Sequence, residues 1–283
     1  MNILYPQEPL PSCVRADGSK MHYAFTSDPH WGAGTRNAEA TRKILRNIDK
    51  GDYDACFITG DIAEFGMFSS YYEEAVNDIK QNLCNTPFRA ITGNHDTLIN
   101  SLSKFKRTFM EKDSDYYYRM DNGNVHVIVL KLLWDMSEWS SRQEKWLIEQ
   151  LESIPQDDTV IVISHCYIIS SGYYDSAAGK NWGDIPEVVE TLCPILEKYN
   201  VDLHISGHDH FFEYSEKEGI GYAVVGTMGG KLDSDFCYYT PYSKWLDFTH
   251  FGWMDVKIFE NKLLLDFLDE DGNSLYKTEI KTN

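Results

Sequence analysis

The chain has 283 residues, of which 42% are hydrophobic and 14% aromatic, and its formal net charge at pH 7 is −18. A chain of this length can bury a substantial core, while so acidic a surface repels polyanions and excludes duplex nucleic acid as an expected partner. No segment has the apolar length of a membrane span, and no basic start precedes an apolar run at the N-terminus, so we expect a cytoplasmic protein without a membrane partner.

Apolar runs typical of buried strands alternate with amphipathic segments typical of helices over the first two thirds of the chain. The predicted strands cover residues 21–27, 55–59, 88–92, 125–130, 159–164 and 201–206, and the predicted helices cover residues 35–48, 69–82, 98–110, 141–154 and 185–199. After Gly219 the pattern predicts strands alone, at residues 221–226, 253–259, 263–268 and 275–280. Asp271-Gly272 is typical of a hairpin between the last two strands. We expect residues 1–20 to form an N-terminal extension and residues 21–283 to form a single α/β domain.

Polar residues that can bind metal ions follow five of these predicted strands. They are Asp28 and His30, then Asp61, then Asn94 with His95 and Asp96, then His165, and finally His208 and His210. Because ligands of open α/β sheets bind beyond the carboxyl ends of the strands, we expect these side chains to converge. Carboxylate, amide and imidazole groups together suit Mn, Fe or Zn. The candidate ligands are too many for one tetrahedral ion, which indicates two ions that share a carboxylate.

The order of these motifs resembles that of the calcineurin-like metallophosphoesterases. The resemblance spans residues 28–210 and rests on Asp28-Pro29-His30, Gly60-Asp61, Gly93-Asn94-His95-Asp96, His165 and Gly207-His208-Asp209-His210. It implies an α/β fold in which a two-sheet β-sandwich is flanked by helices, giving four layers.

The same resemblance implies a role for each motif residue. Asp28, His30 and His210 would hold one divalent or trivalent transition-metal ion, Asn94, His165 and His208 would hold a second, and Asp61 would bridge them. A metal-bridging hydroxide would be the nucleophile. His95 would be the general acid, and Asp96 would hydrogen-bond to His95 and set its tautomer and orientation.

Two positions depart from the family pattern. Cys166-Tyr167 follows His165, where the family often has a proline two residues after this ligand. Purple acid phosphatases, which are relatives within this group, place a tyrosine ligand three residues after the bridging aspartate, and this chain has Glu64 there. We therefore expect no purple iron centre.

The expected function is that of a metal-dependent phosphoesterase acting on a small phosphomonoester or phosphodiester. The alternatives are a protein phosphatase or nuclease of the same fold, or a non-catalytic metal-binding scaffold. Two loops rich in aromatic residues, 170–184 and 228–249, are candidates to cover the site, although packing within each loop is the default interpretation. The oligomeric state stays open.

Overall fold

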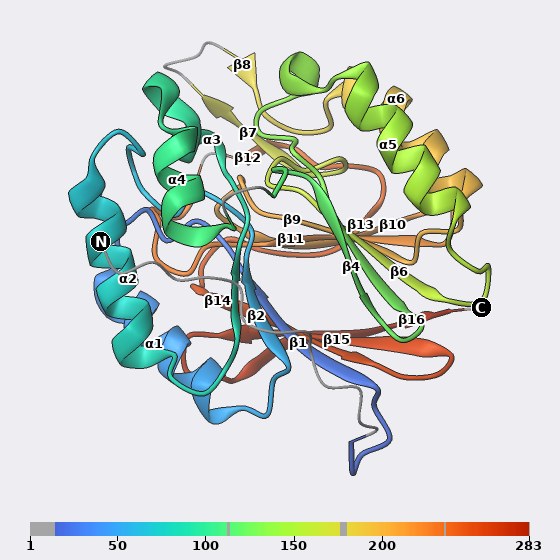
Figure 1. Cartoon of the computed structure of the whole chain (residues 1–283), viewed down its shortest axis with the longest axis horizontal. Coiled ribbons are helices and arrows are strands. Elements are labelled where there is room, and N and C mark those ends of the chain that lie inside the picture. The colour runs from blue at the N-terminus through green and yellow to red at the C-terminus, as the bar shows by residue number, and fades with distance from the viewer. Residues whose placement is uncertain (1–14, 112–113, 176–179, 235, 283) are drawn as a thin grey trace.

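Two large β-sheets pack face to face, with helices on both outer faces (Figure 1). The structure is a computed structural model that describes residues 15–111, 114–175, 180–234 and 236–282. This arrangement of helices, sheet, sheet and helices confirms the four-layer sandwich that the motifs implied.

The first sheet combines three parallel strands with three antiparallel ones. Its strands, in spatial order, are β16 (Ser274–Lys281), β15 (Lys262–Asp269), β14 (Gly252–Ile258), β1 (Met21–Thr26), β2 (Ala55–Ile58) and β3 (Phe88–Ala90). Two helices, α1 (Ala38–Lys50) and α2 (Ser69–Asn82), connect β1, β2 and β3, which run parallel. The α1 helix begins after Asn37, whose side chain accepts a hydrogen bond from the backbone of Ala40, and its buried apolar residues recur at helical spacing along one face.

The second sheet has a parallel centre formed by β5, β6, β9 and β11. Its strands, in spatial order, are β13 (Ser243–Asp247), β10 (Phe212–Lys217), β11 (Ile220–Val225), β9 (Leu203–Ser206), β6 (Thr159–Ile163), β5 (Val125–Val129) and β4 (Tyr118–Asn122). The helices α5 (Ser141–Glu152) and α6 (Pro186–Lys198) lie on its outer face (Figure 1). Both sheets therefore place the carboxyl ends of parallel strands where loops can meet.

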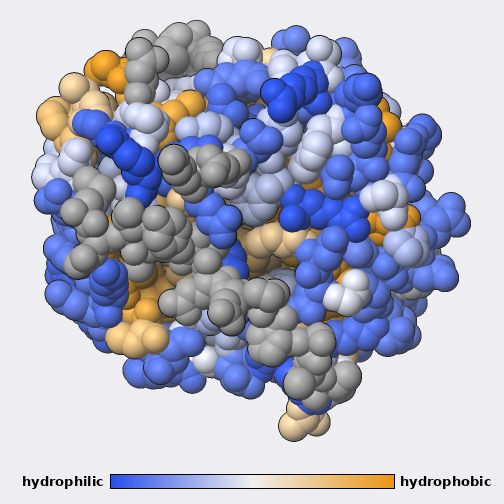
Figure 2. Space-filling model, viewed as in Figure 1, coloured by the Kyte–Doolittle hydropathy of each residue, from blue (hydrophilic) through white to orange (hydrophobic). Residues whose placement is uncertain are grey.

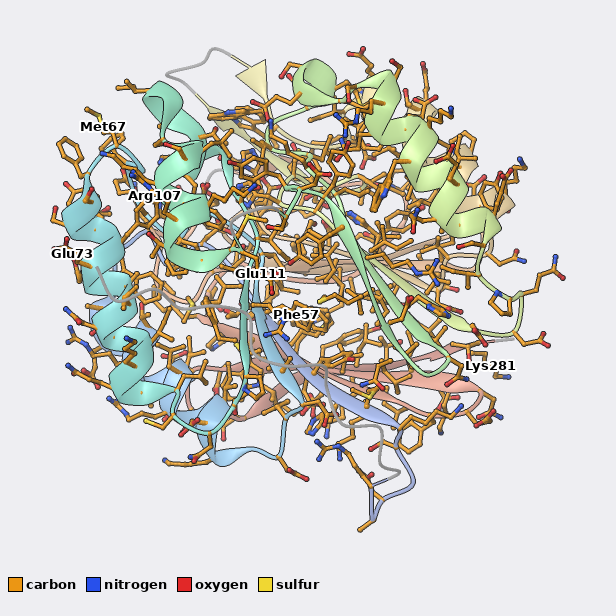
Figure 3. All side chains as sticks on the ribbon, viewed as in Figure 1. Phe57, Met67, Glu73, Arg107, Glu111 and Lys281 are labelled. Carbon is orange, nitrogen blue, oxygen red and sulfur yellow. The ribbon has the colours of Figure 1, made fainter. Side chains whose placement is uncertain are left out.

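Apolar side chains fill the space between the two sheets, and Phe57 lies among them (Figure 3). A second apolar cluster joins the first sheet to α1, α2 and α4 (Leu102–Phe109), and a third joins the second sheet to α5 and α6. Hydrophilic residues cover most of the described surface in the view of Figure 2, in keeping with the net charge. Among the described residues, no helix combines the length and apolar character needed to cross a bilayer.

Some elements differ from the sequence prediction. The predicted helix at residues 98–110 is divided: a 3-10 turn, η1 (Leu98–Asn100), contains the exposed Ile99 at φ 55°, and α4 starts at Leu102. The two aromatic loops contain a small third sheet made of β12 (Phe236–Tyr238), β7 (Gly172–Asp175) and β8 (Lys180–Asn181), and β13 lies in the second of these loops. The described residues also form two short helices, α3 (Asn94–Thr97) and η2 (Met136–Glu138).

Residues 15–20 of the expected N-terminal extension pack on the domain, because the guanidinium of Arg15 pairs with Asp52 and Asp54. Residues 1–14 of that extension lie outside the described part.

Candidate metal centre

The loops after β1, β2, β3, β6 and β9 meet at one end of the sandwich and bring all seven predicted metal ligands together. Five of the seven side chains are buried: Asp28, His30, Asp61, Asn94 and His165. His208 and His210 are partly buried and line a cavity of about 220 Å³. The convergence arises because β1, β2 and β3 are parallel in one sheet and β6 and β9 are parallel in the other.

One group of donor atoms gathers around Asp28. The Nε2 atoms of His30 and His210 are 3.1 Å apart, and Asp28 Oδ1 lies 3.3 Å from His210 Nε2 and 3.6 Å from His30 Nε2. Asp61 Oδ2 lies 3.6 Å from His30 Nε2. Donors that bind one ion at about 2.0–2.2 Å lie roughly 3–3.6 Å apart. Asp28 Oδ1 is buried and has no hydrogen-bond partner, which is costly unless a cation compensates it. These donors fit a metal ion.

A second group of donor atoms gathers around Asn94. Its Oδ1 lies 2.8 Å from His165 Nε2 and 3.0 Å from His208 Nδ1. Asp61 Oδ1 lies 3.4 Å from His165 Nε2. The two carboxylate oxygens of Asp61 thus face the two groups separately, an arrangement in which one carboxylate can bridge two ions.

The imidazoles that face the first and second groups through Nε2 are oriented by acceptors on Nδ1. These contacts run from His30 to Glu64 Oε2 (2.7 Å), from His165 to Thr59 O (2.9 Å) and from His210 to Lys231 O (2.7 Å). An acceptor at Nδ1 holds the proton there and leaves the Nε2 lone pair for a metal ion.

Carboxylates and imidazoles within the site shift one another's pKa values. Burial lowers the pKa of His30, but the Asp28 and Glu64 carboxylates outweigh it and raise that pKa to about 10. Burial likewise opposes the effect of the Asp61 carboxylate on His165, whose pKa rises to about 9. For Asp28, the imidazoles of His210 and His30 outweigh burial and hold its pKa well below its ordinary value. Without metal ions, protons on the imidazoles would balance the buried carboxylates, so protons and metal ions compete for this site.

The backbone is strained at several of the predicted ligands. Four of them adopt the left-handed region that favours glycine: Asp28 (φ 52°), His30 (φ 46°), Asp61 (φ 49°) and His208 (φ 70°). Such a conformation costs on the order of 1 kcal/mol per residue and tends to persist at functional sites. Gly93 is needed for a different reason: a Cβ there would lie 2.1 Å from Asp61 Oδ1.

His95 lies at the edge of the cavity. Its backbone N–H donates to Asp61 Oδ1 (2.9 Å), and its Nδ1 contacts the backbone carbonyl oxygen of Glu64 (2.6 Å). Its Nε2 lies 4.0 Å from Asp61 Oδ2, and 26% of the side chain is exposed. Because His95 Nδ1 donates its hydrogen bond to the Glu64 carbonyl oxygen, Nε2 is the ring nitrogen that faces the cavity.

The predicted hydrogen bond from Asp96 to His95 is wrong. The Asp96 carboxylate instead accepts from the backbone N–H groups of Ile62, Ala63 and Gly93 at 3.0–3.1 Å and from the Tyr72 hydroxyl. The physical reason is burial: the carboxylate is fully enclosed and must satisfy the N–H groups around it. Burial and the Asp61 carboxylate raise the pKa of Asp96 to about 7. Asp96 therefore ties the loop of Asp61 to the loop of Asn94.

Sequence reasoning missed several residues at the site. The sequence pattern identifies Glu64 only as the residue at the position of the tyrosine ligand of purple acid phosphatases, yet its side chain orients His30 and its carbonyl orients His95. The cavity walls also contain Trp134, Tyr173, Trp182 and Asp233. The aromatic composition of loop 170–184 was the only signal for Tyr173 and Trp182, and Trp134 lies outside both candidate loops.

The histidines outside the motifs contact residues outside the metal centre. These contacts are His22 with Asp255, His126 with Asp158, His204 with Ser164 and His250 with Asp247.

Comparisons with known proteins agree with this geometry. Mouse tartrate-resistant acid phosphatase type 5 is 24% identical, over 87% of this chain and 84% of the mouse protein. The structure of a purple acid phosphatase from yellow lupin seeds superposes with a TM-score of 0.78 at 17% identity, and the match covers 92% of this chain but only 53% of the lupin chain. The anchor protein of the Plasmodium inner membrane complex superposes with a TM-score of 0.73 at 16% identity, over 93% of this chain and 89% of that protein.

Groups of His and Asp side chains at this site are candidate metal ligands. The family model described as calcineurin-like phosphoesterase matches residues 21–212. The chain belongs to the calcineurin-like phosphoesterase family.

Proposed function

We propose that this protein hydrolyses a small phosphomonoester, with two transition-metal ions held by the seven ligands and His95 as the general acid. The observation that carries the proposal is the position of His95 Nε2, which faces the cavity beside Asp61, the residue whose two oxygens reach both donor groups. The names of the acid phosphatase relatives favour a monoester over a diester. Carboxylate, amide and imidazole donors suit Mn, Fe or Zn.

The metal pair, when bound, would supply positive charge to the phosphoryl oxygens and make water a competent nucleophile at neutral pH. The residues of the chain hold the ligand groups in place and supply the proton. Asp61 keeps the two ligand groups at a fixed separation, and Glu64 and the backbone carbonyls fix the imidazole tautomers. As water adds to phosphorus, the bond to the ester oxygen breaks, and His95 Nε2 donates its proton to the departing alcohol.

The small cavity, about 220 Å³, favours a small substrate over a folded phosphoprotein. The anchor protein of Plasmodium indicates that this fold can serve a structural role, which is the rival function. A scaffold has no need for an imidazole with a free nitrogen facing the cavity, so we favour catalysis.

The test compares hydrolysis of p-nitrophenyl phosphate and bis(p-nitrophenyl) phosphate by protein loaded with Mn, Fe or Zn. We expect turnover of the monoester that a chelator abolishes and metal restores, and a smaller rate on the diester. Asn94→Ala, which removes the oxygen shared by His165 and His208, should lose this activity. Metal-loaded, folded protein that turns over neither ester would favour the scaffold.

A further inference from the structure

One wall of the cavity is aromatic. Trp134 comes from the loop after β5, Tyr173 lies on β7, and Trp182 follows β8. The backbone N–H of Trp182 donates to the Tyr173 carbonyl (2.9 Å), so these two residues are adjacent on the small sheet. The ring centroids of Trp134 and Trp182 are 6.1 Å apart and their planes are inclined by 29°, and each centroid lies 5.5 Å from that of the His208 ring. The wall therefore begins directly beside a candidate metal ligand.

The charge of the cavity lining is unfavourable for a second anionic group. Beyond the ligands, His95 and the three aromatic residues, the lining contains Asp233, whose carboxylate accepts from the backbone N–H of His210 (2.7 Å). Among the described residues that line the cavity there is no lysine or arginine. A nucleoside diphosphate or a doubly phosphorylated substrate would find no cation for its outer phosphate among the described lining residues. An uncharged, planar group suits this wall better.

Hydrogen bonds connect Ser170 and Ser171, which precede β7, to the segment that carries His208 and His210. Ser170 donates through its hydroxyl to Asp209 (2.7 Å), and Ser171 donates through its backbone and hydroxyl to Glu213 (2.6 Å each). Asp184 accepts from the backbone of Ser170 (2.9 Å), and Asp209 and Glu213 are buried. Fixed supports of this kind hold side chains in one geometry and lower the entropic cost of binding.

We propose that Trp134, Tyr173 and Trp182 form a leaving-group subsite that selects phosphomonoesters whose alcohol carries a planar aromatic ring at or next to the ester oxygen. This inference rests on the proposed phosphomonoesterase function. The aromatic ring of the alcohol must be close to phosphorus, because only the imidazole of His208 lies between the two tryptophan rings and the second group of donor atoms. The aromatic ring of the alcohol packs against the tryptophan and tyrosine faces while the phosphoryl group lies over the ligands. A favourable ring contact is worth about 3- to 10-fold in affinity.

The test uses substrates that differ only in aromaticity. Benzyl phosphate and cyclohexylmethyl phosphate release primary alcohols of similar size and basicity, so the chemical step is matched. We expect kcat/KM to favour benzyl phosphate by about tenfold in the metal-loaded protein. Trp134→Leu and Tyr173→Leu should each reduce this preference by about 3- to 10-fold, mainly through KM, with the metal content unchanged. Trp146→Leu, which alters a ring that packs on Tyr117 at the outer face, is the matched control and should keep the preference.

A binding measurement separates the subsite from the reaction. Isothermal titration with benzylphosphonate and cyclohexylmethylphosphonate, which resist hydrolysis, should show the same preference and the same losses in the variants. A binding preference without turnover of any ester would retain the subsite and reject the phosphatase. Equal affinity for the two phosphonates, or equal turnover of the two esters, would overturn the subsite and leave the phosphatase standing. Loss of metal in Trp134→Leu with equal losses on both ligands would also overturn it, because the ring would then only support His208.

Discussion

Glu64→Gln tests the negative charge that Glu64 places beside His30, a candidate metal ligand. Glu64 Oε2 lies 2.7 Å from His30 Nδ1, and the hydrogen bond to His30 is the main cause that lowers the pKa of Glu64. Glutamine keeps an oxygen acceptor but removes the negative charge, whereas alanine removes both. Loss of such a partner typically costs about 10- to 100-fold in metal affinity or activity, or about 1.4–2.7 kcal/mol. We expect about tenfold weaker binding for glutamine and a loss nearer 100-fold for alanine.

The effect should be confined to the ion held by the first donor group, because Glu64 does not contact Asn94, His165 or His208 in any described hydrogen bond. Chelator competition on stripped and reloaded protein measures the two affinities separately. Glu74→Gln is the matched control, since Glu74 pairs with Arg36 on the helical face. In a His30→Ala background, Glu64→Gln should cause little further loss. Unchanged affinity for both ions in Glu64→Gln, or full additivity with His30→Ala, would refute the proposed coupling.

Substitutions at three other positions, Asp61, His95 and Asp202, have distinct expected outcomes. Asp61→Asn should weaken both metal ions, as measured by chelator competition, whereas His30→Ala should weaken chiefly one; equal effects would contradict a bridging role. His95→Ala should keep both ions and lose about 10²–10⁴-fold on alkyl phosphates, but less on nitrophenyl phosphate, whose leaving group needs no proton; a loss of metal would make His95 a ligand instead. Burial raises the pKa of Asp202 from 3.8 to about 6, against the backbone hydrogen bond from Val160. The folded state therefore binds the proton more tightly than the unfolded state, and stability falls as the pH rises from about 4 through 6. Asp202→Asn should gain on the order of 1–3 kcal/mol in urea unfolding at pH 8 and almost nothing near pH 4; an equal gain at both values would exclude the ionisation as its cause.

The sequence predicted which polar side chains lie together at the site because each set follows an apolar strand that is easy to recognise. The run Thr159–Ile163, for example, is wholly buried and leads directly to His165. The parallel centre of each sheet was not predicted, and the family resemblance supplied the two-sheet sandwich.

Contacts between loops could not be predicted from the sequence pattern. Asp96 adjoins His95 in the chain, yet its carboxylate turns toward the backbone of Ile62 and Ala63, over 30 positions away. Strands β4 and β13 were missed because their residues are mostly polar and only partly buried, so they lack an apolar run. The wall formed by Tyr173 and Trp182 depends on pairing within a small sheet, and their aromatic character alone did not distinguish loop packing from a cavity wall.

The number of metal ions required for activity tests the dinuclear centre most directly. Protein stripped by chelator should be inactive on p-nitrophenyl phosphate, and stepwise addition of Mn, Fe or Zn should restore activity with a break at two equivalents per chain, matched by two equivalents in elemental analysis. Full activity at one equivalent, with no second ion bound after excess metal, would contradict the assignment of Asp61 as a bridge between two groups of donors.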